Sequence, residues 1–153
     1  MKIHHLKARI FSSPEDMEKN RETLKKLLPE DAEINEQLIS PELEGGVFTQ
    51  PLYDLSARLS GKTAEEFLRK ILSSLDQYDF SLLSEKKTMF VDDECNLYLR
   101  LSRKEAEQGS MVFDSKDPVH ITVKLAAYPA KKENALKVLD ELIKEAEDER
   151  KVR

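Results

Sequence analysis

The sequence has no tryptophan, a single cysteine and only four glycines among its 153 residues. The lone thiol, Cys95, excludes an intramolecular disulfide and favours a reducing compartment. No apolar run approaches the roughly 18 residues that span a bilayer. The first 11 residues alternate polar and apolar side chains, which disfavours a secretory signal. These absences predict a cytoplasmic protein that does not enter the membrane.

The length is that of one ordinary domain. A folded chain of this size buries about 70% of the surface that its unfolded form exposes, which is enough for a sizeable core. We expect a single domain over residues 1–148. The charged residues 149–153 would form a tail that frays.

Charge is distributed unevenly along the chain, whose net charge is −5. Residues 27–57 contain no Lys or Arg, and subtracting their seven negative charges from the total leaves +2 for the remainder. These acidic residues are Glu30, Asp31, Glu33, Glu36, Glu42, Glu44 and Asp54. The negative total therefore does not exclude a nucleic-acid partner.

Hydrophobic periodicity predicts both strands and helices. Alternating patterns predict strands at residues 3–11, 34–40, 53–59, 97–101 and 119–127. Helix signals follow Ser13, the Thr63–Glu66 capping box and the Ser102–Glu105 capping box, with further helices at 79–85 and from about Lys131. A loop containing Pro41, Gly45, Gly46 and Pro51 interrupts the acidic stretch. The pattern predicts an α+β fold: a mostly antiparallel or mixed sheet of about five strands, with helices packed on one face.

The opposite face of this sheet is predicted to be basic. Successive strand side chains alternate between faces, so the residues between the apolar positions share the uncovered side. They are His5, Lys7 and Arg9; Asp54, Ser56 and Arg58; Tyr98 and Arg100; and His120, Thr122, Lys124 and Tyr128. Cations with interleaved rings can hold phosphates and stack on unpaired bases. An ordinary solvated sheet face is the alternative.

Cations also gather where helices are predicted to begin. The positive end of the helix dipole makes this an unfavourable place for a cation unless an anion binds there. Three starts show the pattern: Lys62, the pair Arg103 and Lys104, and the pair Lys131 and Lys132. We therefore predict that these five cations contact RNA, with ordinary surface cations as the alternative. The predicted RNA-binding residues of the sheet face are Lys7, Arg9, Arg58, Tyr98, Arg100, His120, Lys124 and Tyr128.

Three segments of the sequence are Leu-Pro-Glu-Asp-Ala at 28–32, Val-Asp-Asp-Glu-Cys-Asn-Leu-Tyr-Leu-Arg-Leu at 91–101 and Ala-Tyr-Pro-Ala-Lys-Lys-Glu-Asn-Ala-Leu at 127–136. They resemble an archaeal family of RNA-binding proteins or predicted exosome subunits. The resemblance implies a fold similar to the ribosomal protein that binds 5S rRNA. It also implies a non-catalytic role with RNA, in RNA processing or at the exosome.

Catalytic and metal sites are weakly supported by the sequence. The run Asp92, Asp93, Glu94 and Cys95 lacks the glycine and the distant glutamate of a calcium loop, so a polar turn is the better interpretation. Adjacent His4 and His5 would point to opposite faces of a strand. We predict no catalytic residues, no metal and no cofactor.

The acidic segment 27–57 supports a second hypothesis. It could contact a basic protein partner, in which case the chain would be an interaction adaptor without direct RNA contact. Exposed edge strands could also pair two copies of the chain.

Overall fold

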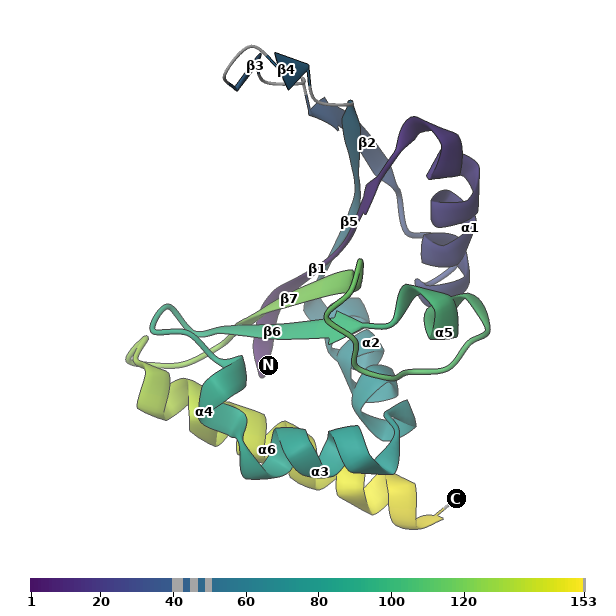
Figure 1. The fold of residues 1–153 in the computed structure, drawn as a ribbon. Helices are drawn as coiled ribbons and strands as arrows, with labels where there is room; N and C mark the ends of the chain where they lie inside the picture. The colour runs from purple at the N-terminus through teal and green to yellow at the C-terminus, as the bar shows by residue number, and fades with distance from the viewer. Residues whose placement is uncertain (40–42, 45–46, 49–50, 153) are drawn as a thin grey trace.

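A five-stranded antiparallel sheet forms the centre of the fold (Figure 1). The computed structural model describes residues 1–39, 43–44, 47–48 and 51–152. The strand order is β2–β5–β1–β7–β6, and every neighbouring pair is antiparallel. The strands are β1 (Ile3–Ser12), β2 (Asn35–Ile39), β5 (Leu52–Ser60), β6 (Asn96–Leu101) and β7 (Val119–Leu125). The predicted α+β class, with a sheet of about five strands, is confirmed.

The helices cover one face of this sheet. They are the 3-10 turn η1 (Pro14–Asp16), α1 (Met17–Leu27), α2 (Gly61–Ser74), α3 (Gln77–Glu85), α4 (Lys87–Phe90), α5 (Arg103–Glu107) and α6 (Lys132–Val152). α2 packs against β1, β5 and α6, while α1 packs against β1 and α5. Figure 1 shows the sheet bending so that its other face, on the side away from α1 and α2, is open and concave. None of the described helices is both long and apolar enough to cross a membrane.

The core lies between the sheet and the helices. Alternate residues of β1, namely Leu6, Ala8 and Ile10, are fully buried, and Ile121 and Val123 of β7 are almost as inaccessible. Burying a Leu, Ile or Val side chain stabilises the folded state by about 1.5–3 kcal/mol. The alternation therefore fixes which face of each strand points to the helices and which points to solvent.

Two helix starts test the predicted capping boxes. Ser102 Oγ accepts a hydrogen bond from Glu105 N–H at 3.2 Å, so Ser102 is confirmed as the N-cap. The reciprocal bond of a capping box is not formed, because the Ser102 N–H donates to the Val112 carbonyl oxygen at 2.7 Å. The box at Thr63 is wrong, because α2 already begins at Gly61. Gly61 has a φ of 60°, a conformation that other residues seldom adopt, and it turns the chain directly from β5 into α2. Thr63 is therefore inside the helix.

The segment predicted as a loop contains a second, two-stranded sheet of β3 (Leu43–Glu44) and β4 (Val47–Phe48). Pro41, Gly45 and Gly46, on which that prediction rested, lie outside the described residues. The short helix α4 was also absent from the predicted elements. β3, β4 and α4 each have four residues or fewer, too few for a repeating apolar pattern of a strand or a helix to be recognised.

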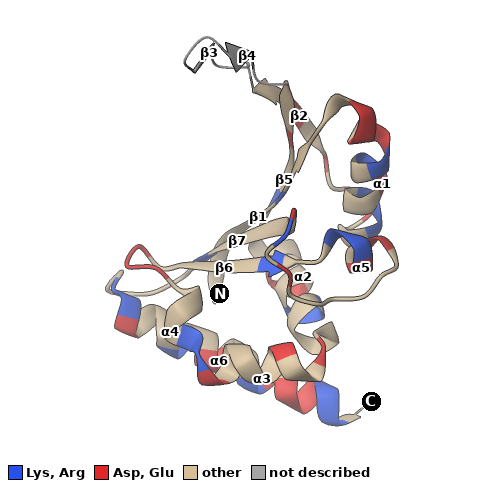
Figure 2. Cartoon of the chain, viewed as in Figure 1, with Lys and Arg blue, Asp and Glu red and all other residues tan. Residues whose placement is uncertain are grey.

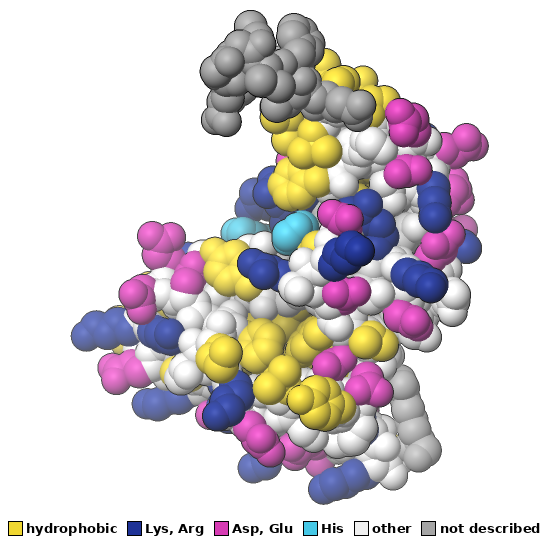
Figure 3. Space-filling view, in the orientation of Figure 1, with side chains coloured by type: hydrophobic (Ala, Val, Ile, Leu, Met, Phe, Trp, Pro, Cys, Tyr) yellow, Lys and Arg dark blue, Asp and Glu magenta, His cyan; other side chains and the backbone are white. Residues whose placement is uncertain are grey.

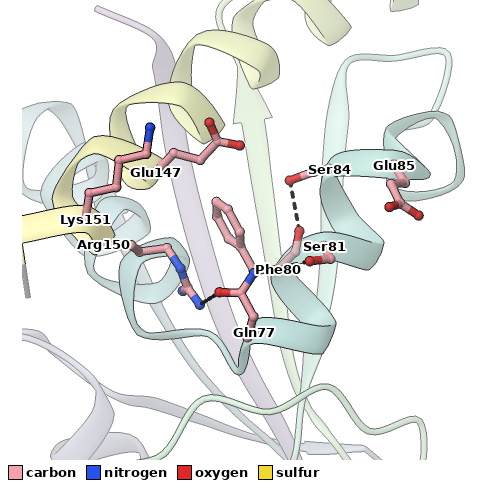
Figure 4. A pocket seen from close by; sticks show the side chains of 8 residues that line it. All are labelled: Gln77, Phe80, Ser81, Ser84, Glu85, Glu147, Arg150 and Lys151. Atoms are coloured by element: carbon pink, nitrogen blue, oxygen red, sulfur yellow. Dashed lines mark hydrogen bonds between the residues drawn. The ribbon is translucent and has the colours of Figure 1, made fainter.

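The charged tail is helical as far as Val152, where the sequence predicted fraying from residue 149. Arg150 anchors it: its guanidinium donates to the carbonyl oxygens of Leu72 at 3.1 Å and Leu75 at 2.7 Å, which close the end of α2. Figure 4 shows Arg150 bonded to Gln77, with the ring of Phe80 close by. The single domain over residues 1–148 stays a prediction, as does the likeness to the 5S-rRNA-binding protein.

Candidate nucleic-acid interface

The strand register brings the predicted basic residues together on the open face. Residues directly opposite each other in an antiparallel pair share a face, with Cβ atoms about 4.5–5.5 Å apart. One row runs Arg100–His120–Arg9–Ser56, and the next runs Tyr98–Thr122–Lys7–Arg58. Lys124 lies opposite both His5 and Asn96. We call Lys7, Arg9, Arg58, Arg100 and Lys124 the cationic face.

The cationic face has an excess of positive charge. Asp54 is the one carboxylate that the pairing of the five described strands places among these residues. It forms an ion pair with Arg9, whose Nε lies 3.0 Å from Asp54 Oδ1 but is not aligned as a hydrogen bond. Lys7, Arg58 and Arg100 have no carboxylate partner within the described part of the chain. Three cations are therefore free to contact an anion.

The distribution of charge is visible in the figures. Figure 2 shows Lys and Arg on β5 and at the end of β6. Figure 3 shows basic and histidine side chains together in the concave part of the molecule.

Because neighbouring strands are about 4.8 Å apart, the distance from β6 to β5 is about 14 Å. The cationic face is thus wide enough to contact more than one phosphate.

Two histidines report the positive potential of this face. Partial burial, followed by the charges of Arg100 and Arg9, lowers the pKa of His120 below its ordinary value. Burial and then Arg58 do the same to the pKa of His5. Both imidazoles therefore resist protonation in the free protein, and an anion bound beside them would reverse part of this effect.

Aromatic rings lie among the cations. The Phe11 and His120 rings meet edge-on, with centroids 5.5 Å apart. The Arg9 guanidinium lies 5.5 Å from the centroid of the Phe11 ring. Tyr98 is 45% exposed, and its hydroxyl donates to Asp92 Oδ2 at 2.8 Å. Phe11 was not among the predicted residues, although it has the same strand parity as Lys7 and Arg9, a signal that places its ring on this face. The face thus offers both rings and charges.

Arg103 was predicted to bind RNA but has a structural role in the free protein. Its guanidinium donates to the Phe11 carbonyl oxygen at 3.0 Å and approaches Asn20 Oδ1 at 3.5 Å. It therefore ties α5 to the end of β1 and to α1. Burial lowers its pKa, as expected for a half-enclosed cation.

The remaining predicted residues lie away from the sheet face. Lys62 is on α2, on the covered side, and lies 3.9 Å from Glu66. Lys104 is exposed on α5. The placement of Tyr128 on a strand beside Lys124 is wrong, because β7 ends at Leu125 and Ala126 instead bonds to Lys2.

The Tyr128 ring extends into solvent past the end of β7. It is 77% exposed and meets His4 edge-on, with the hydroxyl 3.2 Å from His4 Nε2. Lys132 begins α6 as predicted, and Lys131 precedes it. The strand-to-helix junction is thus a separate surface, next to the sheet and not on it.

The acidic run before β6 is a polar turn, as predicted. Asp92 Oδ1 accepts hydrogen bonds from the N–H groups of Glu94 and Asn96, each at 2.9 Å. Partial burial would raise the pKa of Asp92, but these bonds and the Tyr98 hydroxyl outweigh it and lower the pKa. Cys95 is buried in the core. The Asp92 carboxylate therefore fixes the start of β6.

Part of the acidic segment 27–57 is neutralised within the chain. Glu36 Oε1 accepts a hydrogen bond from Arg21 Nε at 2.6 Å, and Asp54 pairs with Arg9. Glu30, Asp31 and Glu33 are exposed between α1 and β2. Glu42 lies outside the described residues.

A protein-family model described as RNA binding matches residues 6–125. The chain belongs to this RNA-binding family. The matched range includes every residue of the cationic face. Over 97% of each sequence, this family member is 29% identical to the RNA-binding protein PAB1135 of Pyrococcus abyssi.

Solved structures support the same fold for this RNA-binding family member. Mth689, a DUF54 protein of Methanothermobacter thermautotrophicus, has a TM-score of 0.72 at 27% identity, covering 94% of this chain and 99% of its own. Protein AF2318 of Archaeoglobus fulgidus, also assigned to DUF54, has a TM-score of 0.76 at 24% identity, covering 92% of this chain and 99% of its own. The second of these likenesses supports the fold alone.

Proposed function

We propose that this chain binds RNA through the cationic face and catalyses no reaction on it. The observation that carries the proposal is the register, which joins cations from four strands into one surface on the uncovered side of the sheet. Membership of an RNA-binding family supports RNA as the polyanion. Rings of Phe11 and Tyr98 lie among the cations and are suited to unpaired bases.

The non-catalytic part of the proposal rests on the acidic turn. Asp92 belongs to the acidic run whose sequence favours a polar turn over a metal site. Both of its oxygens accept hydrogen bonds from its own turn and from Tyr98. An RNA-processing or exosome role is proposed from the family resemblance, with exposed Glu30, Asp31 and Glu33 as the expected contact for a basic protein partner.

The proposed function is tested by titrating labelled single-stranded RNA at several salt concentrations. Each neutralised phosphate contributes about −0.7 to the slope of log affinity against log salt. Three free cations give a slope of about −2, and all five give about −3.5. We expect a slope in this range. An absence of binding at low salt would overturn the proposal, and RNA cleavage by purified protein would overturn its non-catalytic part.

A further inference from the structure

A groove of about 560 Å³ lies beside β6, next to the cationic face. β6 contributes Tyr98 and Arg100 to it, and the other walls include Asp79 of α3, Phe90 of α4 and Phe113 of the loop after α5. Figure 3 shows apolar side chains gathered in the region between β6 and α3, below the basic ones. The volume lies within the range of small-ligand pockets. Since Arg100 belongs to both surfaces, a ligand on one can continue into the other.

The apolar walls of the groove are rings that remain partly accessible. The Phe90 and Phe113 rings are 5.6 Å apart with planes inclined at 36°. Tyr98 and Met89, which also line the groove, are 45% and 77% exposed. Flat, accessible rings beside a cation are typical of sites that stack an unpaired base.

One buried carboxylate gives the groove a polar preference. Asp79 is only 7% exposed, and its Oδ2 accepts the Phe113 N–H at 2.8 Å. Its Oδ1 has no hydrogen-bond partner among the residues that the structure describes and is not one of the fully buried unpartnered atoms, so it is accessible from the groove. An accessible carboxylate oxygen accepts hydrogen bonds, so a ligand in the groove that supplies an N–H would be favoured here.

We propose that this groove holds one unpaired RNA base bearing an exocyclic amino group, with its phosphate at Arg100. An ionised carboxylate can only accept hydrogen bonds. Cytosine, adenine and guanine present an amino group to such an acceptor. Uracil has a single ring N–H, and the carbonyl oxygens on both sides of it repel a carboxylate. Uracil is therefore a poorer partner for Asp79. The assignment rests on the proposed RNA-binding function and adds a base preference to it.

The test compares oligonucleotides of equal charge on the full chain. Octamers of cytidine, uridine and N4,N4-dimethylcytidine carry the same number of phosphates, so the cationic face contributes equally to each. We expect cytidine octamers to bind at least about fivefold more tightly than the other two, which is the ratio that one hydrogen bond provides. Dimethylation keeps the ring and removes the donor, so equal affinity for both cytidine octamers would overturn the assignment.

The matched variants are Asp79→Asn and Asp93→Asn. Asparagine at 79 can still accept the Phe113 N–H, and it turns an NH₂ donor toward the groove. We expect it to reduce the cytidine-to-uridine preference at least about fivefold, with the salt slope unchanged. Asp93 is exposed and lies outside the groove, so Asp93→Asn is the control: it removes the same charge without changing the groove.

The outcomes separate the two proposals. An unchanged preference in Asp79→Asn, or an equal change in Asp93→Asn, overturns the base assignment while leaving RNA binding intact. If no octamer binds at low salt, the proposed function itself fails. Should Asp79→Asn not fold, the dimethylcytidine comparison on the parent protein decides the question alone.

Discussion

Replacing Lys7, Arg58 and Arg100 together by glutamine removes three cations of the cationic face that lack a carboxylate partner in the described part of the chain. Lys124 also lacks one, but its Nζ donates to the carbonyl oxygen of Glu94, so it is left unchanged. Each phosphate contact contributes about −0.7 to the salt slope for a single strand, so the triple variant should flatten the slope by about 2. Stability should change by no more than about 0.5 kcal/mol per site, because Arg58 and Arg100 are exposed and Lys7 is only half-buried.

The assay is fluorescence anisotropy of a labelled single-stranded RNA over a range of salt concentrations, with thermal unfolding to check the fold. The matched control replaces Lys70, Lys137 and Lys144, which are exposed on α2 and α6 away from the open face. It changes the net charge by the same amount. If the control flattens the slope as much as the triple variant does, net charge and not the cationic face determines binding, and the reasoning is refuted.

Three further predictions follow from the same geometry. Because burial and cations hold the pKa values of His5 and His120 below 6.5, bound phosphate should raise both, so RNA affinity should increase as pH falls below about 6.5. Replacing both by glutamine should abolish that dependence in a pH titration, and its persistence would contradict the assignment. Arg150→Ala should lower the free energy of unfolding by about 2–3 kcal/mol in urea without altering RNA affinity, since a charged hydrogen-bond donor and a ring contact are lost. Replacing Lys131 and Lys132 by glutamine should flatten the salt slope by about 1 to 1.4 if the start of α6 binds phosphate. An unchanged slope would confine the interface to the sheet.

Strand parity could be predicted from the sequence because it depends on a local two-residue period. Alternation in β1 and β7 separates Ile10 and Val123 from Arg9 and Lys124, and burial of the first pair forces the second pair outward. Parity predicts which residues of one strand share a face. The register of antiparallel pairing then places the basic faces of four strands side by side. The apolar pattern favoured antiparallel pairing but could not predict which residues pair.

The errors concern strand ends and contacts between distant segments. Tyr128 keeps the parity of Lys124, but the strand ends at Leu125 and the periodicity does not show where pairing stops. Arg103 was predicted to bind RNA because it is a cation at a helix start, while its contact with Phe11 joins residues 92 positions apart. No local pattern reports such a contact.

The groove beside β6 was not predictable for the same reason. Asp79 and Phe113 come from different segments, and their hydrogen bond spans 34 positions. The sequence showed Asp79 only as a polar residue at the start of a short helix. Its burial, and the acceptor it presents to the groove, exist only once α3 packs beside β6.

The central claim is that RNA contacts the open face of the sheet. The most direct test is a two-dimensional amide NMR titration of the chain with a short single-stranded RNA. The largest amide shifts should map to β1, β5, β6 and β7, around Lys7, Arg58, Arg100 and Lys124, with little change along α6. Shifts concentrated on α2 and α6, or in the exposed acidic stretch around Glu30, would contradict the central claim.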